Sequence, residues 1–495
     1  MKRRDFLTTT VSVAALTYLS RQAEAWSQNH HLLHSSQIHR TYPSWASRDL
    51  FLQGINAPVF QEVDLDNLPV TGEIPPDLAG MYVRNGPNPM FQPIAYAYPL
   101  EGDGMLHAVY FEAGKAKYRN RWILTKGLIY EMQAKQALPE LRFRNYANTH
   151  IIAHAGKLLA LYETGLPYEV SRDLETIGEW SFNGKLEQAM TAHPKLDVDT
   201  GELHFYRYSF FTEPYLTYYV ANAAGEITRT TGIELPQPAL LHDMALSDNY
   251  AIFCHCPLVF DFQQAMRTGI PLVWQPEQGA RIGLIHRHDL DRKPIWIETE
   301  AFWVWHFMNA FEQNGTLVVD CAYYPQMILE NTLSAILSNR SRFQRLTINL
   351  DDRTITQQAL DDRNVDFPSL DRQQTGKPYR FGYMPHMDLE LIAQKAIPNY
   401  FPELIQYDLV NQTSQVHRLQ PGCYCGEATV VPKSNATSAT DHYVLTWVFN
   451  EITQTSDLLI LDAVNFTAAP LAQIHLPVRV PMGTHGSWIF AGEAA

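Results

Sequence analysis

Trp303-Val304-Trp305-His306-Phe307-Met308-Asn309-Ala310-Phe311-Glu312 is an apolar stretch that alternates like a β-strand and contains a single histidine. With a period of two residues, both tryptophans share one face with Phe307, and His306 points away from them. Gln313-Asn314-Gly315 is a turn signal and residues 316–320 are a second apolar run, so the unit is predicted to be a β-hairpin. In one isolated hairpin, His306 would be a core histidine whose ring nitrogens bond to neighbours.

Short strand-like runs separated by turn signals continue from Ile74 almost to the C-terminus. Residues 203–211 follow a turn at 197–201, and residues 250–254 follow another at 247–249. Few long helical patterns interrupt them, which predicts an all-β sandwich, barrel or propeller. Residues 51–495 are long enough to form one large body, and radial repetition is then the most economical way to avoid exposed strand edges.

The overall charge excludes one class of partner. The chain of 495 residues is 46% hydrophobic and carries a formal net charge of −14. No long run of lysine or arginine follows the first few residues, whereas phosphate binding requires a basic stripe. The composition therefore argues against a nucleic-acid partner and is typical of an acidic enzyme with a large core.

The N-terminus has the features of a targeting segment. Met1-Lys2-Arg3-Arg4-Asp5-Phe6-Leu7 is basic, an apolar segment follows, and Ala23-Glu24-Ala25 offers a cleavage site. Residues 1–25 are predicted to be a twin-arginine-type signal peptide, with export to a periplasm or thylakoid lumen; an uncleaved amphipathic tail is the alternative. Residues 26–50 form a polar lead-in whose histidines lack the order of a metal site, namely His30, His31, His34 and His39.

Two insertions differ from the strand pattern. Residues 257–280 and 323–340 are apolar with mixed or helix-like periodicity. They are expected to form a dome over the β body. Their apolar side chains would line a substrate entrance, touch a membrane surface or simply pack against the body.

The five cysteines include two Cys-x-Cys pairs, Cys254 with Cys256 and Cys423 with Cys425. Such pairs suggest a zinc site, but residues two apart on a strand merely share a face, and zinc sites usually use Cys-x-x-Cys.

Four histidines stand in comparable places, namely His193, His242, His306 and His485. After each of the first three, a turn and a new apolar strand follow. If the strand pairs are arranged radially, equivalent positions face the axis, and imidazoles that meet at one point form a metal site. His150 and His154 precede an apolar strand with a similar offset, so the pattern alone does not select the four.

Several motifs together resemble those of the carotenoid cleavage oxygenases. They are Gly80-Met81-Tyr82-Val83-Arg84-Asn85-Gly86-Pro87-Asn88-Pro89, Glu101-Gly102-Asp103-Gly104-Met105-Leu106-His107, the His306-x-x-Asn309-Ala310-Phe311-Glu312 stretch and His485-Gly486-Ser487-Trp488. The resemblance runs from about Gly72 to the end. It implies a seven-bladed β-propeller with a helical and loop dome, and a non-haem ferrous iron, Fe(2+), held by His193, His242, His306 and His485.

The resemblance also implies three supporting carboxylates. Glu163, Asp366 and Glu427 match the family's acidic positions and would support His242, His306 and His485 respectively. An acceptor on one ring nitrogen fixes the tautomer and leaves the other nitrogen free to bind metal. Asp366 stands where glutamate is common, so a longer or water-mediated contact to His306 is expected. Leu124 stands where arginine is often found.

The resemblance implies an iron-dependent dioxygenase that uses dioxygen to cleave a carbon-carbon double bond of a carotenoid or apocarotenoid, at the 15,15' position, into two carbonyl products. The residues alone would equally suit zinc, copper or nickel. The substrate would be a lipophilic polyene bound in an apolar tunnel. The alternatives are cleavage of a stilbene-type alkene, with Lys126 pairing with a phenolate, isomerisation without oxidation, and a propeller that binds polyenes without turnover.

Overall fold

The computed structural model describes residue 45 and residues 49–93, 101–141, 144–264, 270–330 and 332–494. The predicted signal peptide (1–25) and the histidines of the lead-in lie outside these residues. Among the helices of the described part, none has the length and apolar character needed to cross a bilayer.

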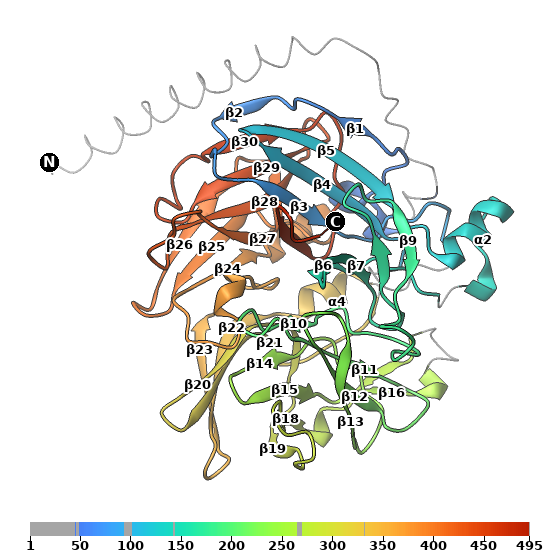
Figure 1. Ribbon diagram of the computed structural model, residues 1–495, viewed down its shortest axis with the longest axis vertical. Helices are drawn as coiled ribbons and strands as arrows, with labels where there is room; N and C mark the ends of the chain where they lie inside the picture. Colours follow the sequence, from blue (N-terminus) through green and yellow to red (C-terminus); the bar gives the residue numbers. More distant parts are fainter. Residues whose placement is uncertain are drawn as a thin grey trace, which may run out of the picture. The chain divides into compact units, whose positions relative to one another are not determined.

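Seven antiparallel sheets are arranged around a common axis as the blades of a propeller (Figure 1). The predicted all-β, seven-bladed architecture is confirmed. In β5 (Lys115–Trp122), buried residues alternate with exposed or half-buried ones, as the sequence pattern predicted. In β28 (His442–Asn450), by contrast, every residue is buried, because neighbouring blades cover both faces of the strand.

The first three blades consist of strands that follow one another in the chain, except that β31 joins blade 1 from the C-terminal end. Blade 1 contains β1 (Asp64–Leu65), β5, β4 (Met105–Glu112), β3 (Gly80–Arg84) and β31 (Gly486–Phe490). Blade 2 contains β6 (His150–His154), β7 (Lys157–Leu161), β8 (Tyr168–Val170) and β9 (Thr176–Glu179). Blade 3 contains β10 (Lys195–Leu196), β11 (Leu203–Tyr208), β12 (Leu216–Ala221) and β13 (Ile227–Ile233).

The remaining blades complete the ring. Blade 4 contains β14 (Ala245–Leu246), β15 (Tyr250–His255), β18 (Ala280–His286) and β19 (Ile295–Thr299). Blade 5 contains β20 (Trp303–Gln313), β21 (Thr316–Tyr324), β22 (Arg342–Asn349) and β23 (Ile355–Asp361). Blade 6 contains β24 (Phe381–His386), β25 (Glu403–Asp408) and β26 (Thr413–Arg418). Blade 7 contains β27 (Cys423–Pro432), β28, β29 (Thr455–Asp462), β30 (Ala472–His475) and β2 (Val70–Gly72).

The ring is closed by strands from both ends of the sequence. β31, near the C-terminus, pairs with β3 of blade 1, and β2, from the N-terminal part, pairs with β30 of blade 7 (Figure 1). Both pairings are antiparallel. Each terminal region therefore completes a blade that the other region builds, and neither blade has its full set of strands without the other end of the chain.

The hairpin around His306 forms as predicted, with one correction. Its turn residues Asn314 and Gly315 have φ values of 52° and 77°, as a tight two-residue hairpin turn requires. The register of β20 against β21 shifts between Val304 and Phe307, which marks a β-bulge. Because the bulge breaks the alternation, Trp305 and His306 line the same cavity, and the expectation that His306 points away from both tryptophans was wrong.

The dome consists of short elements around the insertions. Within residues 258–274, β16 (Leu258–Phe260) and β17 (Leu272–Trp274) pair as a hairpin, and residues 262–264 between these strands are helical. In the second insertion, residues 323–324 still belong to β21, and α4 (Leu333–Ser338) follows a loop. α4 packs against α5 (Leu389–Lys395). The described residues also contain α2 (Lys126–Ala134) and the 3-10 helices η2 (Leu50–Leu52), η3 (Gly54–Asn56), η4 (Pro139–Leu141), η5 (Pro276–Gln278) and η6 (Arg372–Gln374).

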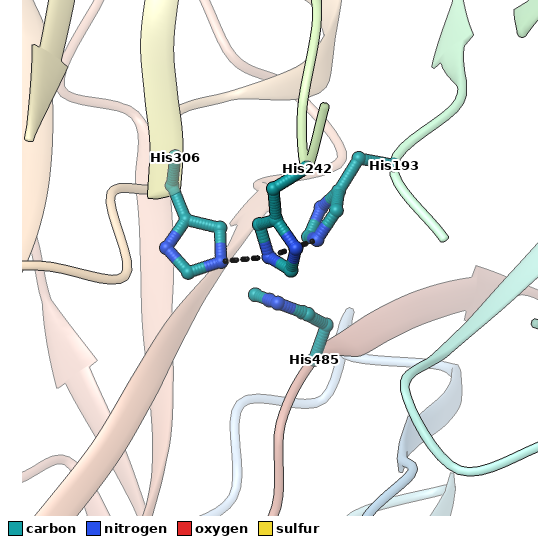
Figure 2. Close-up of side chains that lie close together, drawn as sticks. All are labelled: His193, His242, His306 and His485. Atoms are coloured by element: carbon teal, nitrogen blue, oxygen red, sulfur yellow. Dashed lines mark hydrogen bonds between the residues drawn. The ribbon is translucent and has the colours of Figure 1, made fainter. Parts of the chain in front are cut away.

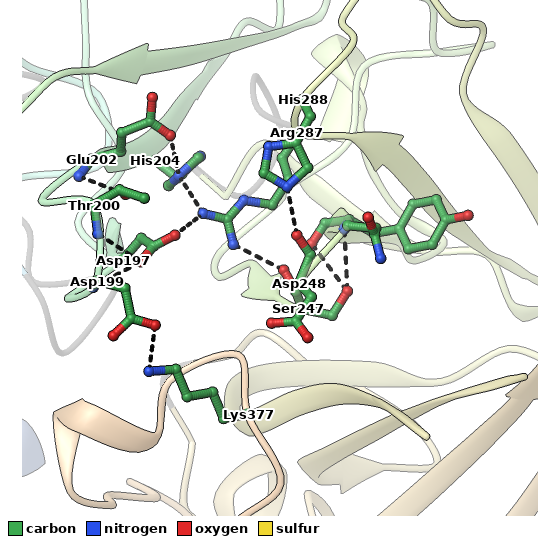
Figure 3. A network of polar contacts seen from close by, with 12 residues as sticks. Asp197, Asp199, Thr200, Glu202, His204, Ser247, Asp248, Arg287, His288 and Lys377 are labelled. Carbon is green, nitrogen blue, oxygen red and sulfur yellow. Dashed lines mark hydrogen bonds and ion pairs between the residues drawn. The ribbon is translucent and has the colours of Figure 1, made fainter. Parts of the chain in front are cut away.

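A polar network joins three blades (Figure 3). Arg287, which follows β18 of blade 4, pairs with Asp197 in the turn after β10 of blade 3, and its Nη1 donates to the carbonyl of Ser247 at 2.9 Å. Lys377, in the loop before β24 of blade 6, pairs with Asp199 at 2.5 Å. The turn predicted at residues 197–201 is therefore also a point of contact between blades.

Candidate metal centre

The inner strands of four blades bring four histidines to the axis. His193 lies just before β10, His242 just before β14, His306 within β20, and His485 just before β31. Their rings face one another, as Figure 2 shows. The four histidines are far apart in the sequence. They meet at one point because each stands at or near the start of the inner strand of its blade.

The spacing of the ring nitrogens fits a single metal ion. The Nε2 atoms of His193 and His242 are 3.0 Å apart, and those of His242 and His306 are 3.3 Å apart. One ligand atom from each of the four histidines lies within 4.8 Å of the others. Two imidazole nitrogens bound to one ion at about 2.1 Å, at roughly right angles, are about 3 Å apart. The donor set and its spacing therefore match a metal site.

All four histidines are buried. Their exposed fractions are between 5% and 8%. Burial holds the pKa of His193 well below its usual value, and the neighbouring histidines lower it further. Burial also lowers the pKa of His306. Neutral imidazoles are the form that binds metal ions.

Three of the four histidines contact a carboxylate through Nδ1. His306 donates to Asp366 Oδ1 at 2.8 Å and His485 donates to Glu427 Oε1 at 2.8 Å. His242 Nδ1 contacts Glu163 Oε1. Since a carboxylate only accepts, Nδ1 carries the proton and Nε2 presents its lone pair to the axis. For His193, no carboxylate contact occurs among the described residues.

The contact of Asp366 corrects one expectation. The side chain is one methylene shorter than glutamate, yet it reaches His306 directly at 2.8 Å. The next residue, Phe367, has a φ of 53°, and its N–H donates to Asp366 Oδ1 at 2.7 Å. This turn of the backbone brings the carboxylate close to the ring, so the missing methylene does not lengthen the contact.

Glu427 has a further stabilising environment. Burial alone would raise its pKa, but His485 and a hydrogen bond from Gly486 N, at 3.0 Å, outweigh burial and leave the pKa below its usual value. The carboxylate is therefore ionised, and it accepts from the ligand and from the first residue of β31 at the same time.

Two of the three carboxylates also accept a tyrosine hydroxyl. Tyr208 donates to Glu163 Oε2 at 2.8 Å, and Tyr324 donates to Asp366 Oδ2 at 2.6 Å. Burial, and then the charge of Glu163, raises the pKa of Tyr208 well above its usual value, so its hydroxyl stays protonated and acts as a donor. These bonds fix the carboxylates from the side opposite the histidines.

Asp243 connects three of the histidine-bearing segments. Its Oδ1 pairs with Lys195 Nζ at 2.8 Å, and Lys195 lies two residues after His193. Its Oδ2 accepts from Phe307 N at 2.8 Å, next to His306. Since Asp243 itself follows His242, one buried carboxylate holds the segments of blades 3, 4 and 5 together.

The fourth segment is held by the motif that begins at Gly80. Asn85 is completely buried, and its Nδ2 donates to the carbonyl of Ala147 at 2.7 Å. Asn85 N donates to His485 O at 3.0 Å, and Thr484 N donates to Asn85 O at 3.0 Å. The motif is thus more than a surface loop, because it fixes the backbone on both sides of His485.

His150 and His154 differ in their relation to the centre. His150 is the first residue of β6, and its ring centroid lies 5.4 Å from that of His485. Its Nδ1, however, bonds to Ala192 O at 2.9 Å, and its ring does not join the converging nitrogens. His154, at the other end of β6, bonds to Gly201 O at 3.2 Å.

An apolar cavity of about 210 Å³ opens from the histidines into the dome. His242, His306 and His485 line it, while His193 does not, so the accessible side of the cluster faces the cavity. Trp305 stands edge to face against His242, with ring centroids 4.7 Å apart, and the Phe367 ring lies 5.1 Å from His306. The apolar residues that line the cavity are Phe51, Ile270, Trp305, Met327, Ile328, Leu329, Ile336, Phe367, Met387 and Pro398.

The other residues that the sequence singled out lie away from this cavity. Lys126 is largely exposed and pairs with Glu179 at 2.5 Å, and Leu124 is 39% exposed. The five cysteines are unpaired. Among the described residues, the histidine cluster is the one group whose donor atoms converge as a metal site requires.

The sequence predicted the three supporting carboxylates, but not the further residues that hold the ligand segments in place, namely Asp243, Tyr208 and Tyr324. For Asp243, the sequence did contain an indication. A charged residue within the apolar stretch Leu240-Leu241-His242-Asp243-Met244 needs a buried partner. For Tyr208 and Tyr324, the sequence contained no such indication, because each tyrosine is distant in the sequence from the carboxylate that it contacts. Phe51 is the first residue after the predicted lead-in (26–50), and nothing in the sequence indicated that it lines a cavity.

The fold and the cluster define a class: a seven-bladed propeller with a four-histidine candidate metal site on its axis. The model of the protein family described as retinal pigment epithelial membrane protein matches residues 56–490 of this chain. A carotenoid cleavage oxygenase from Mycobacterium tuberculosis is 32% identical, over 89% of this chain and 98% of that protein. An isoeugenol monooxygenase from Pseudomonas nitroreducens is 31% identical, over 88% and 97%.

Solved structures show the same similarity. A lignostilbene dioxygenase from Pseudomonas brassicacearum superposes with a TM-score of 0.83 at 26% identity, over 92% of this chain and 100% of that one. A cobalt-substituted apocarotenoid oxygenase from Synechocystis gives 0.78 at 27% identity, over 88% and 97%. The chain belongs to the retinal pigment epithelial membrane protein family, which includes the carotenoid cleavage oxygenases. The predicted family and the prediction of an oxygenase are confirmed.

Proposed function

We propose that this protein is an iron(II)-dependent dioxygenase that cleaves one carbon-carbon double bond of a carotenoid or apocarotenoid. The observation that carries the proposal is the convergence of four buried imidazoles at the inner end of an apolar cavity. In the reaction, one alkene and one dioxygen give two carbonyl compounds, so both oxygen atoms are accounted for and no external reductant is consumed.

Iron is favoured by the chemistry of the family together with the donor set. His193, His242, His306 and His485 would hold the ion, and four neutral ligands leave its full positive charge in place. Imidazole suits iron, copper, nickel and zinc, but zinc has no redox chemistry to offer an oxygenase. When bound, iron(II) would supply the redox centre at which dioxygen and an electron-rich alkene react.

The chain's own residues prepare and protect the centre. Glu163, Asp366 and Glu427 keep Nδ1 of three ligands protonated and so direct Nε2 inward. Trp305 and Phe367 line the cavity beside the ligands, and their aromatic surface makes the space next to the centre apolar. The apolar walls bind the polyene by burial, and its position against the centre selects the double bond.

We place the cleaved bond at the central 15,15' position. The structural similarity to the bacterial apocarotenoid oxygenase supports this choice. The test is to load purified protein with iron(II), supply an apocarotenal under air, and identify the aldehydes by chromatography and mass spectrometry. Products from another bond would refute the position alone, whereas no carbonyl product from any polyene or stilbene would refute the proposed function.

A second candidate is cleavage of a stilbene-type or phenylpropene-type alkene. The similarity to the lignostilbene dioxygenase and to the isoeugenol monooxygenase supports it. The position of Lys126 does not, because its ammonium group pairs with Glu179 on the surface and lies outside the cavity lining. Supplying a hydroxystilbene and an apocarotenal in parallel, and comparing kcat/KM, separates the two substrate classes.

Two further alternatives are distinguished by simple measurements. An isomerase would convert its substrate without consuming oxygen, so an oxygen electrode separates it from a dioxygenase. A propeller that binds polyenes without turnover would not retain stoichiometric iron after purification, which metal analysis tests. In both assays His306→Ala is the matched control, because it removes one candidate ligand.

We also propose that the dome touches a membrane surface, from which a lipophilic substrate would enter. Phe211 and Phe262 are 76% and 66% exposed. Phe211 packs against Phe260 of the hairpin that leads to the cavity-lining Ile270. Replacing both exposed phenylalanines with serine is expected to reduce sedimentation with lipid vesicles, whereas Val410→Ser, an exposed apolar residue in the turn after β25, is expected to have no effect.

A further inference from the structure

Tyr324 is part of the cavity wall and also touches the support of a candidate metal ligand. It lies at the end of β21, is 5% exposed, and lines the cavity. Its hydroxyl donates to Asp366 Oδ2 at 2.6 Å, and Asp366 Oδ1 accepts from His306 Nδ1 at 2.8 Å. One short chain of hydrogen bonds therefore runs from the cavity wall to the candidate ligand.

The two oxygens of Asp366 have different partners. Oδ1 accepts from both His306 and the backbone of Phe367, while Oδ2 accepts from Tyr324. A carboxylate held on one oxygen only can still rotate about its terminal bond, which would move Oδ1 away from the imidazole. The bond from Tyr324 removes that freedom. In the orientation fixed in this way, Asp366 Oδ1 lies 2.8 Å from His306 Nδ1.

We propose that Tyr324 is a positioning residue that holds the Asp366 carboxylate against His306 and so links cavity occupancy to the metal ligand. A substrate that fills the cavity contacts the Tyr324 ring, and any displacement of that ring is passed to the carboxylate. Tyr208 makes the corresponding contact with Glu163, behind His242. At Glu427, the backbone N–H of Gly486 occupies the corresponding place. The inference rests on the proposed metal-binding function.

The test measures metal binding directly. Cobalt(II) is titrated into metal-free protein against a competing chelator, and its visible absorption bands report the ligand field. Tyr324→Phe is expected to lower the affinity for cobalt(II) roughly tenfold and to shift the bands, since loss of an outer partner commonly weakens metal binding by this amount or more. Adding a non-cleavable apolar ligand is expected to shift the bands of the wild type and not those of the variant.

A matched control separates positioning from loss of stability. Tyr379→Phe removes a bond of the same kind, because Tyr379 donates to the buried Asp320 at 2.7 Å, but that carboxylate pairs with Arg345 and not with a histidine. Both variants are expected to lower the thermal midpoint to a similar extent, and only Tyr324→Phe is expected to alter cobalt(II) binding.

A double-mutant cycle tests whether Tyr324 acts through Asp366. In an Asp366→Asn background, Tyr324→Phe is expected to have little further effect on affinity, because the carboxylate it holds is already gone. Equal cobalt(II) affinity and spectra for wild type, Tyr324→Phe and Tyr379→Phe would overturn the inference, as would strictly additive effects in the cycle. Failure of the wild type to bind cobalt(II) or iron(II) would instead overturn the proposed function.

Discussion

Asp243 Oδ2 accepts a hydrogen bond from the backbone N–H of Phe307 at 2.8 Å. This bond joins the residue after His242 to the residue after His306, and the other oxygen of Asp243 reaches Lys195 near His193. The relative position of three candidate ligands therefore depends on a single carboxylate that is 5% exposed.

Asp243→Asn is expected to lower metal affinity roughly tenfold, because an amide cannot accept at both ends and one segment is released. The free energy of unfolding is expected to fall by about 1–3 kcal/mol, the usual cost of leaving a buried partner unpaired. Chelator competition and urea unfolding measure the two effects. Asp248→Asn, an exposed neighbour in the same blade, is the control, and equal metal affinity in the two variants would contradict the role assigned to Asp243.

Removal of a candidate ligand is expected to abolish metal binding without unfolding the propeller. His306→Ala leaves Asp366 without its imidazole but keeps the hairpin of β20 and β21, whose ladder of paired residues continues on both sides of the bulge. Metal content measured after purification should drop to background, and circular dichroism should be unchanged. Full iron content in this variant would place the metal elsewhere.

The protein is expected to lose stability in mild acid because many histidines are buried in their neutral form. Burial, and then the charge of Arg287, lowers the pKa of His204 to about 3, and burial lowers the pKa of His442 to about 4. Unfolded histidine has a pKa of about 6.5. Between these values the unfolded chain binds protons that the folded chain does not, so the stabilisation is complete above about pH 6.5 and declines as the pH falls towards the folded pKa.

Each such histidine adds a slope of up to about 1.4 kcal/mol per pH unit to the unfolding free energy. Urea midpoints at about pH 7.5 and about pH 5 should therefore differ clearly, with the lower value in acid. His204→Gln is expected to reduce the difference. Its amide can accept from Arg287 and donate to Tyr218, the partners that His204 has at 3.1 Å and 2.5 Å (Figure 3 shows the first). Identical midpoints at both pH values would contradict this account.

Phe51 is expected to influence which substrates fit. It lies in η2, is 8% exposed, and forms part of the cavity wall, with Ile336 of the dome as a neighbour. Phe51→Ala enlarges the cavity, so kcat/KM for an alkene with a bulky end group should rise about tenfold relative to a slim one, the scale of discrimination in an apolar pocket.

Leu52→Ala provides the comparison for this experiment. Leu52 is buried in the same segment but does not line the cavity, so its truncation costs stability without changing the pocket. If both variants leave the substrate preference unchanged, Phe51 has no role in selection.

Much of the architecture could be predicted because local patterns repeat. Alternating apolar residues and turn signals such as Asn314-Gly315 carry their own structural information, and repetition of strand pairs made a radial arrangement economical. The same repetition suggested which histidines would face a common axis, although His150 shared the pattern and the motifs were needed to separate it from the four.

What could not be predicted depends on contacts between distant segments. The bulge at Trp305 and His306 has no sequence marker, since it results from the pairing of β20 with β21. The direct contact of Asp366 depends on the backbone turn at Phe367, and the bond from Tyr324 depends on where β21 ends. Such features follow from the assembled fold and not from any local run of residues.

The fourth histidine stands directly before the strand that closes the ring. Since His485 immediately precedes β31, and β31 pairs with β3 of the first blade, three imidazoles are translated long before the last one. During synthesis, the ribosome must release nearly the whole propeller before this donor can join the others. The proposed metal would therefore enter the site only after translation, once the ring has closed.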